Sequence, residues 1–266
     1  MDADLQGQVT SHAAEVYETF FVPALFAPWA PRVADAARLA PGEKVLDVAC
    51  GTGVLAREAA LRVTPGGAVT GLDRNEGMLA VARRVAPALD WRSGVAEALP
   101  FPDRAFDAVV SQFGLMFFAD RIKALQEMWR VLAPGGWLAL AVWDALERSP
   151  GYAAMVALLR RLFGEHVASE LRGPFVLGDT AELRALLAAA GISNAEIRTL
   201  DGTARFPSLE SWVRTDIKGW TLADRIDDAQ YRTLQAEAPR ELGPFVGPDG
   251  AVVFAAPAHI VTARKP

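Results

Sequence analysis

Between Lys44 and Trp143, short runs of apolar and β-branched residues alternate strictly with amphipathic stretches. This alternation predicts βαβ units, because parallel strands are joined by crossover connections that are usually helices. Helices then cover both faces of the sheet, so its strands can be apolar throughout. We therefore expect an α/β fold with strands at residues 44–49, 68–72, 89–92, 106–111 and 137–143 and helices at 54–63, 76–86 and 120–132.

The segments on either side of this alternating core are mostly helical in pattern. Residues 11–39 are expected to form helices that are interrupted by three prolines. After the core we expect helices at 151–163, 180–190 and 208–238, and strands at 192–200 and 251–263. The length of 266 residues fits a single domain, 1–266, with a sizeable insertion. Its expected parts are an N-terminal helical cap (1–40), a core (41–143), and lid helices plus the last two strands (144–266).

The composition excludes several classes of protein. The chain is 52% hydrophobic with a net charge of −5, so it can form a full core and is not expected to carry a basic groove for nucleic acid. Its single cysteine excludes an internal disulfide, and no group of His, Asp and Glu has metal-ligand spacing. The acidic start lacks the positive charge of a secretory signal, and no apolar run reaches about 18 residues. We therefore expect a soluble, cytoplasmic protein with no membrane span and no metal.

A glycine-containing loop follows the first expected strand and opens the first expected helix. Its sequence, DVACGTG, runs from Asp47 to Gly53. Glycines lack a Cβ, so the backbone can turn tightly and approach a ligand, and the helix start offers free N–H groups. Asp73 lies 20 residues after Gly53, at the end of the second strand, where a carboxylate can accept both hydroxyls of a ribose. The order of strand, loop, helix, strand and acid predicts a nucleoside site.

Two cofactor classes fit this loop. Residues 51–56 (GTGVLA) satisfy the dinucleotide fingerprint G-x-G-x-x-G/A, so an NAD-type oxidoreductase stays open. Asp47, however, stands close to where a diphosphate would sit, and its carboxylate would repel it. A ligand with a cationic amino group would instead be attracted to Asp47. This favours S-adenosylmethionine, which combines an amino-acid tail, a sulfonium and a ribose with no phosphate.

Four segments carry a further signal: residues 45–53 (VLDVACGTG), 71–79 (GLDRNEGML), 96–110 and 129–136 (WRVLAPGG). Together they resemble the class I S-adenosylmethionine-dependent methyltransferases, as seen in ubiquinone and menaquinone biosynthesis and in many small-molecule methyltransferases. The resemblance covers about residues 41–143 and makes that core the cofactor-binding part. It implies a Rossmann-like seven-stranded sheet with helices on both faces, a helical lid over the acceptor, and last two strands that run antiparallel to each other. It also implies methyl transfer to O, N or C of a small, largely apolar molecule, with S-adenosylhomocysteine as product.

The resemblance assigns roles around the methionine and the ribose. Asp47 would orient the loop and the amino group of the methionine part. Gly51 and Gly53 would let the backbone pack against that part, and Asp73 would hold the ribose hydroxyls. Gln112, just past the fourth strand, would face the methionine tail or the acceptor.

Roles around the adenine follow in the same way. Arg74 and Met78 would flank the ring, and Ala96 would offer its backbone N–H to a ring nitrogen. The family often has an aspartate directly before this alanine, which accepts from the adenine amino group. This chain has Val95 there, so Glu97 or backbone carbonyls are left as substitutes.

Aromatic residues outside the cofactor motifs are candidates for the acceptor pocket: Tyr17, Phe113, Trp29 and Trp212. No catalytic constellation is visible, since transfer from a sulfonium can rest largely on proximity and orientation. An acceptor hydroxyl or carbon acid would also use a general base. The candidates for this base are His12, Tyr17 and His166, whereas His259 falls within an expected strand and is interpreted as structural.

Two alternatives stay open beside methyl transfer to a small molecule. One is a pericyclase-like protein that binds the cofactor on the same fold and transfers no methyl group, and the other is the NAD-type oxidoreductase. A nucleic-acid methyltransferase is disfavoured, because residues 111–114 (SQFG) lack the Asn/Asp-Pro-Pro-aromatic motif of enzymes that methylate base amino groups. The sequence leaves the acceptor, the base and the oligomeric state open.

Overall fold

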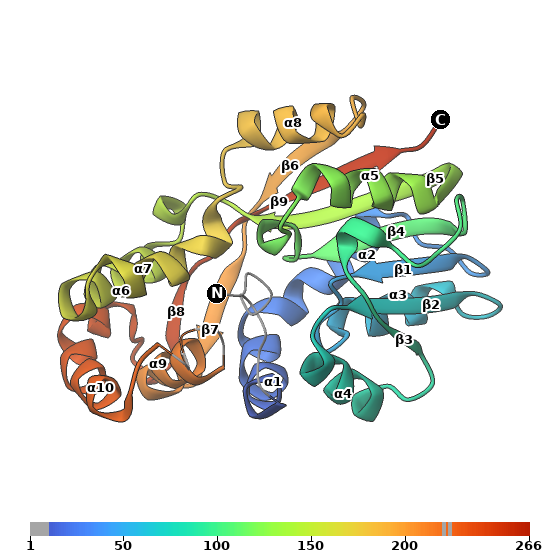
Figure 1. Ribbon diagram of the computed structural model, residues 1–266. Helices are drawn as coiled ribbons and strands as arrows, with labels where there is room; N and C mark the ends of the chain where they lie inside the picture. The colour runs from blue at the N-terminus through green and yellow to red at the C-terminus, as the bar shows by residue number, and fades with distance from the viewer. Residues whose placement is uncertain (1–10, 220–221, 223–224) are drawn as a thin grey trace.

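A seven-stranded sheet forms the centre of the computed structural model, which describes residues 11–219, 222 and 225–266 (Figure 1). The strand order is β3-β2-β1-β4-β5-β9-β6. The first five strands are parallel, and β9 runs antiparallel to both β5 and β6. The predicted fold class and the antiparallel last two strands are therefore confirmed. The strands are β1 (Lys44–Val48), β2 (Ala68–Asp73), β3 (Asp90–Ser93), β4 (Phe106–Gln112), β5 (Leu132–Trp143), β6 (Glu196–Leu200) and β9 (Ala258–Arg264).

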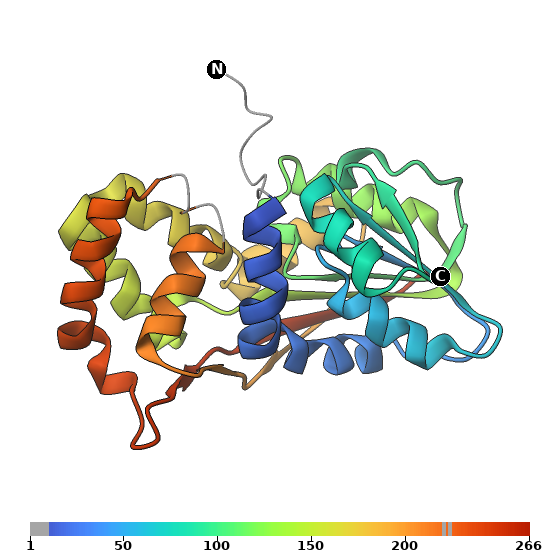
Figure 2. The same cartoon turned by 90° about the horizontal axis from the view of Figure 1, so that it is seen from below.

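Helices cover both faces of this sheet, as the apolar strands require. One face is covered by α2 and α3, and the opposite face by α5 and α8 (Figures 1 and 2). Side chains cap three of the helices, since Asn75, Asp120 and Asp179 each accept from a backbone N–H of the first turn that follows. The helices of this half are α2 (Ala30–Ala36), α3 (Val54–Val63), α4 (Glu76–Val85), α5 (Arg121–Val131) and α8 (Thr180–Ala189).

A second, helical half lies beyond the carboxyl ends of β1, β2 and β4, and the N-terminal segment lies between the two halves (Figures 1 and 2). In it α6 packs on α7 and α10, and α10 packs on α9. The N-terminal α1 contacts both α4 and α9, so it bridges the halves. These elements are α1 (Ser11–Val16), the π-helix η2 (Tyr17–Phe26), α6 (Pro150–Phe163), α7 (Glu165–Arg172), α9 (Leu209–Lys218) and α10 (Asp228–Leu242).

Short 3₁₀ turns complete the secondary structure: η3 (Ala27–Trp29), η4 (Ala96–Ala98), η5 (Leu115–Phe117), η6 (Leu146–Arg148), η7 (Gly173–Phe175) and η9 (Gly243–Phe245).

The expected strand 251–263 is wrong as one element, because it is broken at Pro257. Its first part, β8 (Val252–Ala255), pairs with an unexpected strand, β7 (Thr203–Phe206), in a separate two-stranded sheet. Only the second part, β9, joins the central sheet. Proline has no N–H to donate to a ladder, so the chain changes sheets there. The expected helix 208–238 is likewise two helices, since Asp227 starts α10 with its own capping box.

The helices α6 and α7 leave the sheet half and return to it at nearly the same point. Asp144 follows β5, and Gly178 precedes α8. A Cβ added at Gly178 would overlap the backbone of Ala145, so these two ends touch. His259 of β9 joins them: its Nε2 donates to the Gly178 carbonyl (2.9 Å) and lies 3.3 Å from Oδ1 of Asp144. His259 is 2% exposed, which agrees with its structural interpretation.

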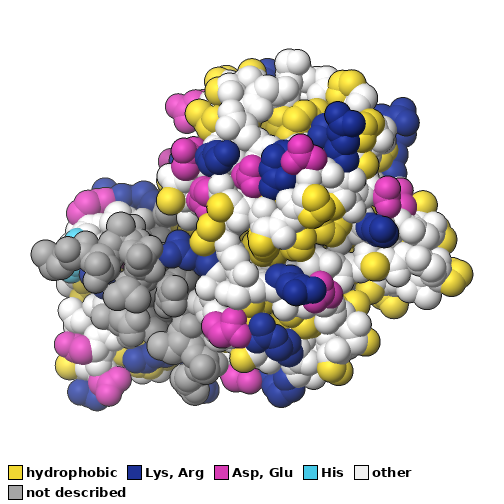
Figure 3. Space-filling view, turned by 45° about the vertical axis from the view of Figure 1, so that its right-hand side comes forward, with side chains coloured by type: hydrophobic (Ala, Val, Ile, Leu, Met, Phe, Trp, Pro, Cys, Tyr) yellow, Lys and Arg dark blue, Asp and Glu magenta, His cyan; other side chains and the backbone are white. Residues whose placement is uncertain are grey.

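On the molecular face shown in Figure 3, positive and negative side chains are intermixed, with hydrophobic side chains between them. Within the described part of the chain, none of the helices has the length and apolar character needed to cross a lipid bilayer. The same residues contain no group of three or more His, Cys, Asp or Glu side chains arranged to hold a metal ion.

Candidate functional site

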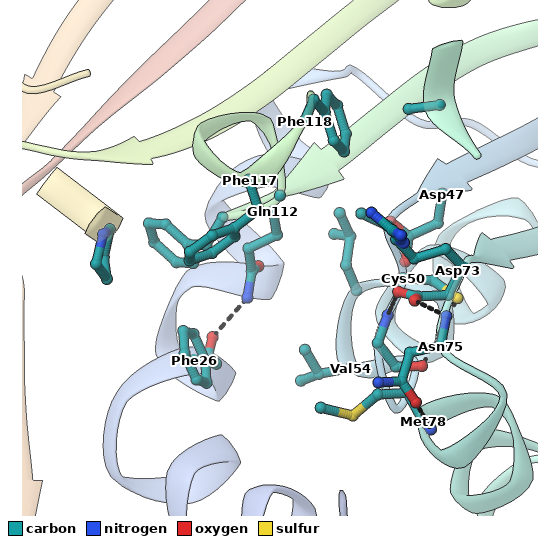
Figure 4. A pocket seen from close by; sticks show the side chains of 18 of the residues that line it. Phe26, Asp47, Cys50, Val54, Asp73, Asn75, Met78, Gln112, Phe117 and Phe118 are labelled. Carbon is teal, nitrogen blue, oxygen red and sulfur yellow. Dashed lines mark hydrogen bonds between the residues drawn. The ribbon is translucent and has the colours of Figure 1, made fainter. Parts of the chain in front are cut away.

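A pocket opens at the carboxyl ends of β1, β2 and β4, which is where ligands bind in open α/β sheets (Figure 4). Its walls come from the sheet half, from η2 and from the helical half. Of the predicted cofactor residues, seven line it: Asp47, Gly51, Asp73, Arg74, Met78, Ala96 and Gln112. Of the predicted acceptor residues, Tyr17 and Phe113 line it.

The loop after β1 is held open by left-handed backbone conformations. Ala49 has φ 57° and Gly51 has φ 55°, which turns the chain back toward β2. Gly53 also has a positive φ, 87°, but it does not line the pocket, contrary to expectation. A Cβ added at Gly53 would overlap the ring of Trp91, so this glycine allows Trp91 to pack under the loop.

Asp73 organises the loop from the end of β2. Its Oδ2 accepts from the Gly51 N–H and its Oδ1 from the Asn75 N–H, both at 2.8 Å (Figure 4). Asn75 in turn caps α4 by accepting from the Met78 N–H. Burial raises the pKa of Asp73, and the two amide hydrogen bonds oppose that shift. Asn75 lines the pocket although no motif singled it out; its position directly before a helix was the available signal.

Asp47 contrasts with Asp73, because its charge is not compensated. The residue is 1% exposed, and neither carboxylate oxygen has a hydrogen-bond partner within the described residues. Burial raises the pKa of Asp47 well above its usual range, the charge of Asp73 adds to this, and the nearby Ala56 amide opposes it only in part. A buried carboxylate without a partner is costly, so this position calls for a cation from a ligand.

The N-terminal segment forms the wall opposite the loop. The π-helix η2 contributes Tyr17, Phe21, Leu25 and Phe26 to the lining, and π-helical turns often occur at functional sites. The segment is tied to the sheet half by Glu18, which pairs with Arg57 of α3 at 2.9 Å.

Tyr17 and Gln112 face the pocket with defined hydrogen-bonding capacity. Burial, and next the charge of Asp73, raise the pKa of Tyr17 above its usual range. Tyr17 therefore stays protonated at neutral pH, where it can donate a hydrogen bond. Gln112 Nε2 donates to the Phe26 carbonyl at 3.0 Å, while its Oε1 is buried and has no partner among the described residues (Figure 4).

The far end of the pocket is aromatic. Phe113 lies parallel to Trp143, with ring centroids 3.7 Å apart and an interplanar angle of 5°. Phe113 also has φ 56°, an uncommon conformation for a residue with a side chain and one that clusters at functional sites. The wall continues through Phe26 and through further rings that sequence reasoning missed: Phe117, Phe118, Tyr152 and Phe175.

The remaining end of the pocket lies beside β3 and η4. Val95 is 41% exposed there although it is apolar, next to the buried Ala96. Glu97 lines the same end, and its Oε1 accepts from the Ala119 and Asp120 amides at 2.9 and 3.3 Å.

Several predicted residues do not reach the pocket. Trp29 is 1% exposed and packs edge-on against Phe113 and Trp143, so it supports the aromatic wall from behind. Trp212 is fully buried inside the helical half. His166 is exposed on α7 and is absent from the lining, and the side chain of His12 lies outside the described residues.

Comparison with known proteins gives two levels of similarity. The profile of a family described as a methyltransferase domain matches residues 46–140. The demethylmenaquinone methyltransferase of Thermus thermophilus is 39% identical over 184 residues, which cover 62% of this chain and 81% of that protein. Two further relatives of the same description match it over only about half of their own length.

Solved structures extend the similarity to the whole fold. Phosphoethanolamine N-methyltransferase 2 of Haemonchus contortus, in complex with S-adenosyl-L-methionine, has a TM-score of 0.61 at 20% identity over 97% of this chain and 58% of its own. The [4+2]-cyclase SpnF has a TM-score of 0.53 at 20% identity over 90% of this chain and 81% of its own. At these identities the likeness is one of fold alone, and the fold carries more than one type of reaction.

Proposed function

The chain belongs to the class I S-adenosylmethionine-dependent methyltransferases, and from that premise we propose that its pocket binds the cofactor at the end that carries Asp47 and Asp73 (the carboxylate end). A flat, largely apolar acceptor would bind at the aromatic end. It is a methyltransferase of small molecules, of the type found in quinone biosynthesis. The non-methylating and NAD-type alternatives are not favoured, because the relatives above 30% identity are methyltransferases. The acceptor and the roles of single residues are our proposal.

The uncompensated carboxylate of Asp47 is the observation that carries the assignment of the cofactor end. The amino group and the sulfonium of S-adenosylmethionine are cations, and either would relieve the cost of burying Asp47 without a partner. Gly51 leaves space beside the methionine part, since a Cβ there would meet nothing within 4 Å. Asp73, with further lone pairs on the two oxygens that already fix the loop, is positioned for the ribose hydroxyls. A diphosphate would meet two carboxylates here.

The adenine belongs at the end formed by β3, α4 and η4. Met78 and the exposed Val95 supply apolar contact for a flat ring, and Arg74 borders the same space. The Ala96 amide is the proposed donor to a ring nitrogen. Glu97 is the proposed acceptor from the adenine amino group, in place of the aspartate that Val95 replaces.

The parallel pair Phe113 and Trp143 and the surrounding rings support an aromatic acceptor. Stacked and edge-on aromatic contacts are worth about 0.5–1.5 kcal/mol beyond area burial. Relatives named demethylmenaquinone methyltransferases support a quinone-type ring in its reduced, hydroxyl-bearing form. We place the methylated atom on such a ring, at an oxygen or at a carbon beside it.

The residues around the aromatic end orient the acceptor and exclude water. When bound, S-adenosylmethionine supplies an electrophilic methyl group on a good leaving group. The pKa values of Tyr17, Cys50 and Tyr152 are all raised, so these residues hold their protons at neutral pH. Tyr17 and Gln112 then supply a donor and an acceptor that align the ring hydroxyl. Because the described lining offers no base at this end, the proton released from the acceptor would pass to water. A ring hydroxyl, with a pKa of about 10, gives up that proton more readily than an aliphatic hydroxyl does.

The remaining parts of the proposal concern the setting of the enzyme. We propose that residues 1–40, 41–143 and 144–266 act as cap, cofactor-binding core and lid of one domain, with a small molecule and no nucleic acid as partner. The net charge of −5 supports the exclusion of nucleic acid. The free, buried Cys50 fits a reducing compartment such as the cytoplasm.

Two measurements test the proposed function. In a thermal-shift screen, S-adenosylhomocysteine should stabilise the protein and NADH should not. With radiolabelled S-adenosylmethionine under anaerobic conditions, 1,4-dihydroxynaphthalene should become labelled, whereas an aliphatic amine should not. Stabilisation by NADH alone would overturn the cofactor assignment. Cofactor binding without label in any hydroxylated aromatic ring would overturn the acceptor assignment.

A further inference from the structure

A set of buried polar atoms lies behind the aromatic wall and has no role in the function proposed above. Tyr152 of α6 lines the pocket, yet its hydroxyl oxygen is fully buried and has no hydrogen-bond partner among the described residues. The hydroxyl therefore lies behind the pocket wall, inside the helical half. The indole nitrogen of Trp212 and both carboxylate oxygens of Asp216 are buried in the same half without partners.

These three side chains, one from α6 and two from α9, form one cluster. Trp212 and Asp216 are one helical turn apart on α9, so they share a face. The rings of Tyr152 and Trp212 are 6.4 Å apart and nearly perpendicular, and Phe254 of β8 packs against both. Because Trp212 contacts Tyr152 and lies one turn from Asp216 on the same helix, the three polar side chains occupy one region of the helical half.

None of the described ion pairs gives Asp216 a positively charged partner, and this affects the protonation of its carboxyl group. Its side chain is fully buried and forms none of the ion pairs of the described residues. Burial raises the pKa of Asp216 well above its usual range and so favours the protonated, neutral form of the carboxyl group. A neutral carboxyl group is both a donor and an acceptor, and it can pair with the Tyr152 hydroxyl and the Trp212 N–H together.

Stability alone does not account for this arrangement. Replacing buried polar groups by apolar groups of similar volume is often neutral or stabilising, whereas polar clusters can fix one geometry among several. The geometry at stake is that of the Tyr152 ring, because this ring is the member of the cluster on the pocket surface.

We infer that Asp216, through Trp212 and the Tyr152 hydroxyl, is a positioning residue that fixes the Tyr152 ring as a wall of the acceptor site and so determines which aromatic rings fit. This inference rests on the proposed function, since it presumes that the aromatic end receives the acceptor. Asp216 contacts neither acceptor nor cofactor. Its loss should therefore affect acceptor binding and leave cofactor binding unchanged.

The test compares variants that differ mainly in their capacity to form hydrogen bonds. Asp216→Asn keeps a neutral donor and acceptor, Asp216→Leu removes both, and Tyr152→Phe removes only the hydroxyl. Controls in the same half are Glu210→Gln, exposed on α9, and Tyr231→Phe, on α10 outside the pocket. Calorimetry measures the affinity for 1-naphthol with S-adenosylhomocysteine bound, and separately the affinity for S-adenosylhomocysteine.

We expect Asp216→Leu and Tyr152→Phe each to weaken naphthol binding about tenfold, equal to about 1.4 kcal/mol. The double variant should be no worse than either single one, because both changes break the same cluster. Asp216→Asn and both controls should stay within twofold, and S-adenosylhomocysteine affinity should be unchanged throughout. Should Asp216→Leu fail to fold, Tyr152→Phe carries the test alone.

Other outcomes separate this inference from the proposed function. Naphthol affinities within twofold for both Asp216→Leu and Tyr152→Phe would overturn the inference, as would equal losses of naphthol and S-adenosylhomocysteine affinity. A loss in Asp216→Asn as large as in Asp216→Leu would overturn it too, because a neutral partner would then not suffice. Wild-type protein that binds naphthol but labels no ring would contradict the proposed transfer and leave the positioning role intact. Wild-type protein that does not bind naphthol would overturn both.

Discussion

Asp47 and Asp73 are neighbouring buried carboxylates with opposite environments. Asp73 accepts hydrogen bonds from two backbone amides, whereas neither oxygen of Asp47 has a hydrogen-bond partner among the described residues. Both have raised pKa values, so the folded, ligand-free protein keeps protons that the unfolded chain releases. The associated stability is present below the ordinary carboxyl pKa and is lost as pH rises through the raised values. A cationic ligand reverses this at Asp47, because it favours the ionised form.

Asp47→Asn should therefore make the ligand-free protein more stable at pH 8, and this advantage should vanish as the pH falls toward about 4. The same change should weaken S-adenosylhomocysteine binding at least tenfold, because the amino group loses its carboxylate. Thermal melts across a pH series, with and without the ligand, measure both effects. A ligand-free variant less stable than the wild type at pH 8 would contradict the interpretation of Asp47.

Asp73→Ala should weaken S-adenosylhomocysteine binding at least tenfold, a loss of about 1.4 kcal/mol. The variant loses the proposed ribose contacts and also the acceptors that hold the Gly51 and Asn75 amides. Asp73→Asn keeps one acceptor oxygen and should lose less. Fluorescence or calorimetric titration measures both, and unchanged affinity in Asp73→Ala would mean that the ribose lies elsewhere.

Gly51 and Gly53 form a matched pair for separating backbone strain from side-chain overlap. Both have a positive φ, but a Cβ at Gly51 meets open space and one at Gly53 overlaps Trp91. Gly51→Ala should cost about 1–2 kcal/mol for the left-handed conformation. Gly53→Ala should cost about 1–3 kcal/mol more, from overpacking. Urea unfolding of the ligand-free proteins compares them, and equal costs would mean that Trp91 moves aside freely.

At the scale of elements, the core strands and helices were predictable because their signals are local. Each signal lies within a few residues of the element that it predicts. Examples are the apolar runs of the strands, the glycine turn, and the helix caps Asn75, Asp120 and Asp179. The change of sheet at Pro257 was not predictable in the same way. A β-branched run on both sides of the proline reads as one strand, and its partner β7 is fixed only by tertiary pairing.

The N-terminal segment is the element whose attachment should control ligand release. Glu18→Met removes the ion pair with Arg57 and keeps the hydrogen bond from Arg57 to the Thr52 carbonyl in the loop. We expect S-adenosylhomocysteine to dissociate several-fold faster with the fold intact. The matched control is Glu15→Met, because the pair of Glu15 with Arg84 is half exposed and contributes little. Stopped-flow displacement measures the rates, and equal rates in both variants would show that this ion pair does not hold the segment.

At the scale of the molecule, the pocket is an assembly of segments far apart in the chain. Its carboxylate end comes from one loop and the following strand, so sequence motifs could indicate these residues. Its aromatic end combines Phe26, Phe113, Trp143, Tyr152 and Phe175. These rings come together only when the N-terminal segment, the sheet half and the helical half are packed against one another. Trp29 and Trp212 show the reverse, since aromatic character alone does not distinguish a pocket wall from the layer behind it.

The chain leaves and re-enters the sheet half at one place, where Ala145 contacts Gly178 and His259 binds the Gly178 carbonyl. The proposed acceptor site can therefore vary separately from the proposed cofactor site. Because the chain departs and returns at one place, the intervening helices can change in length or sequence without altering the register of the sheet. Closing a longer loop at fixed ends costs little, about 0.6 kcal/mol for each doubling of its length. The segment from 145 to 178 contributes Tyr152 and Phe175 to the aromatic end of the pocket, so changes within it would alter the proposed acceptor site and leave the loop after β1 in place.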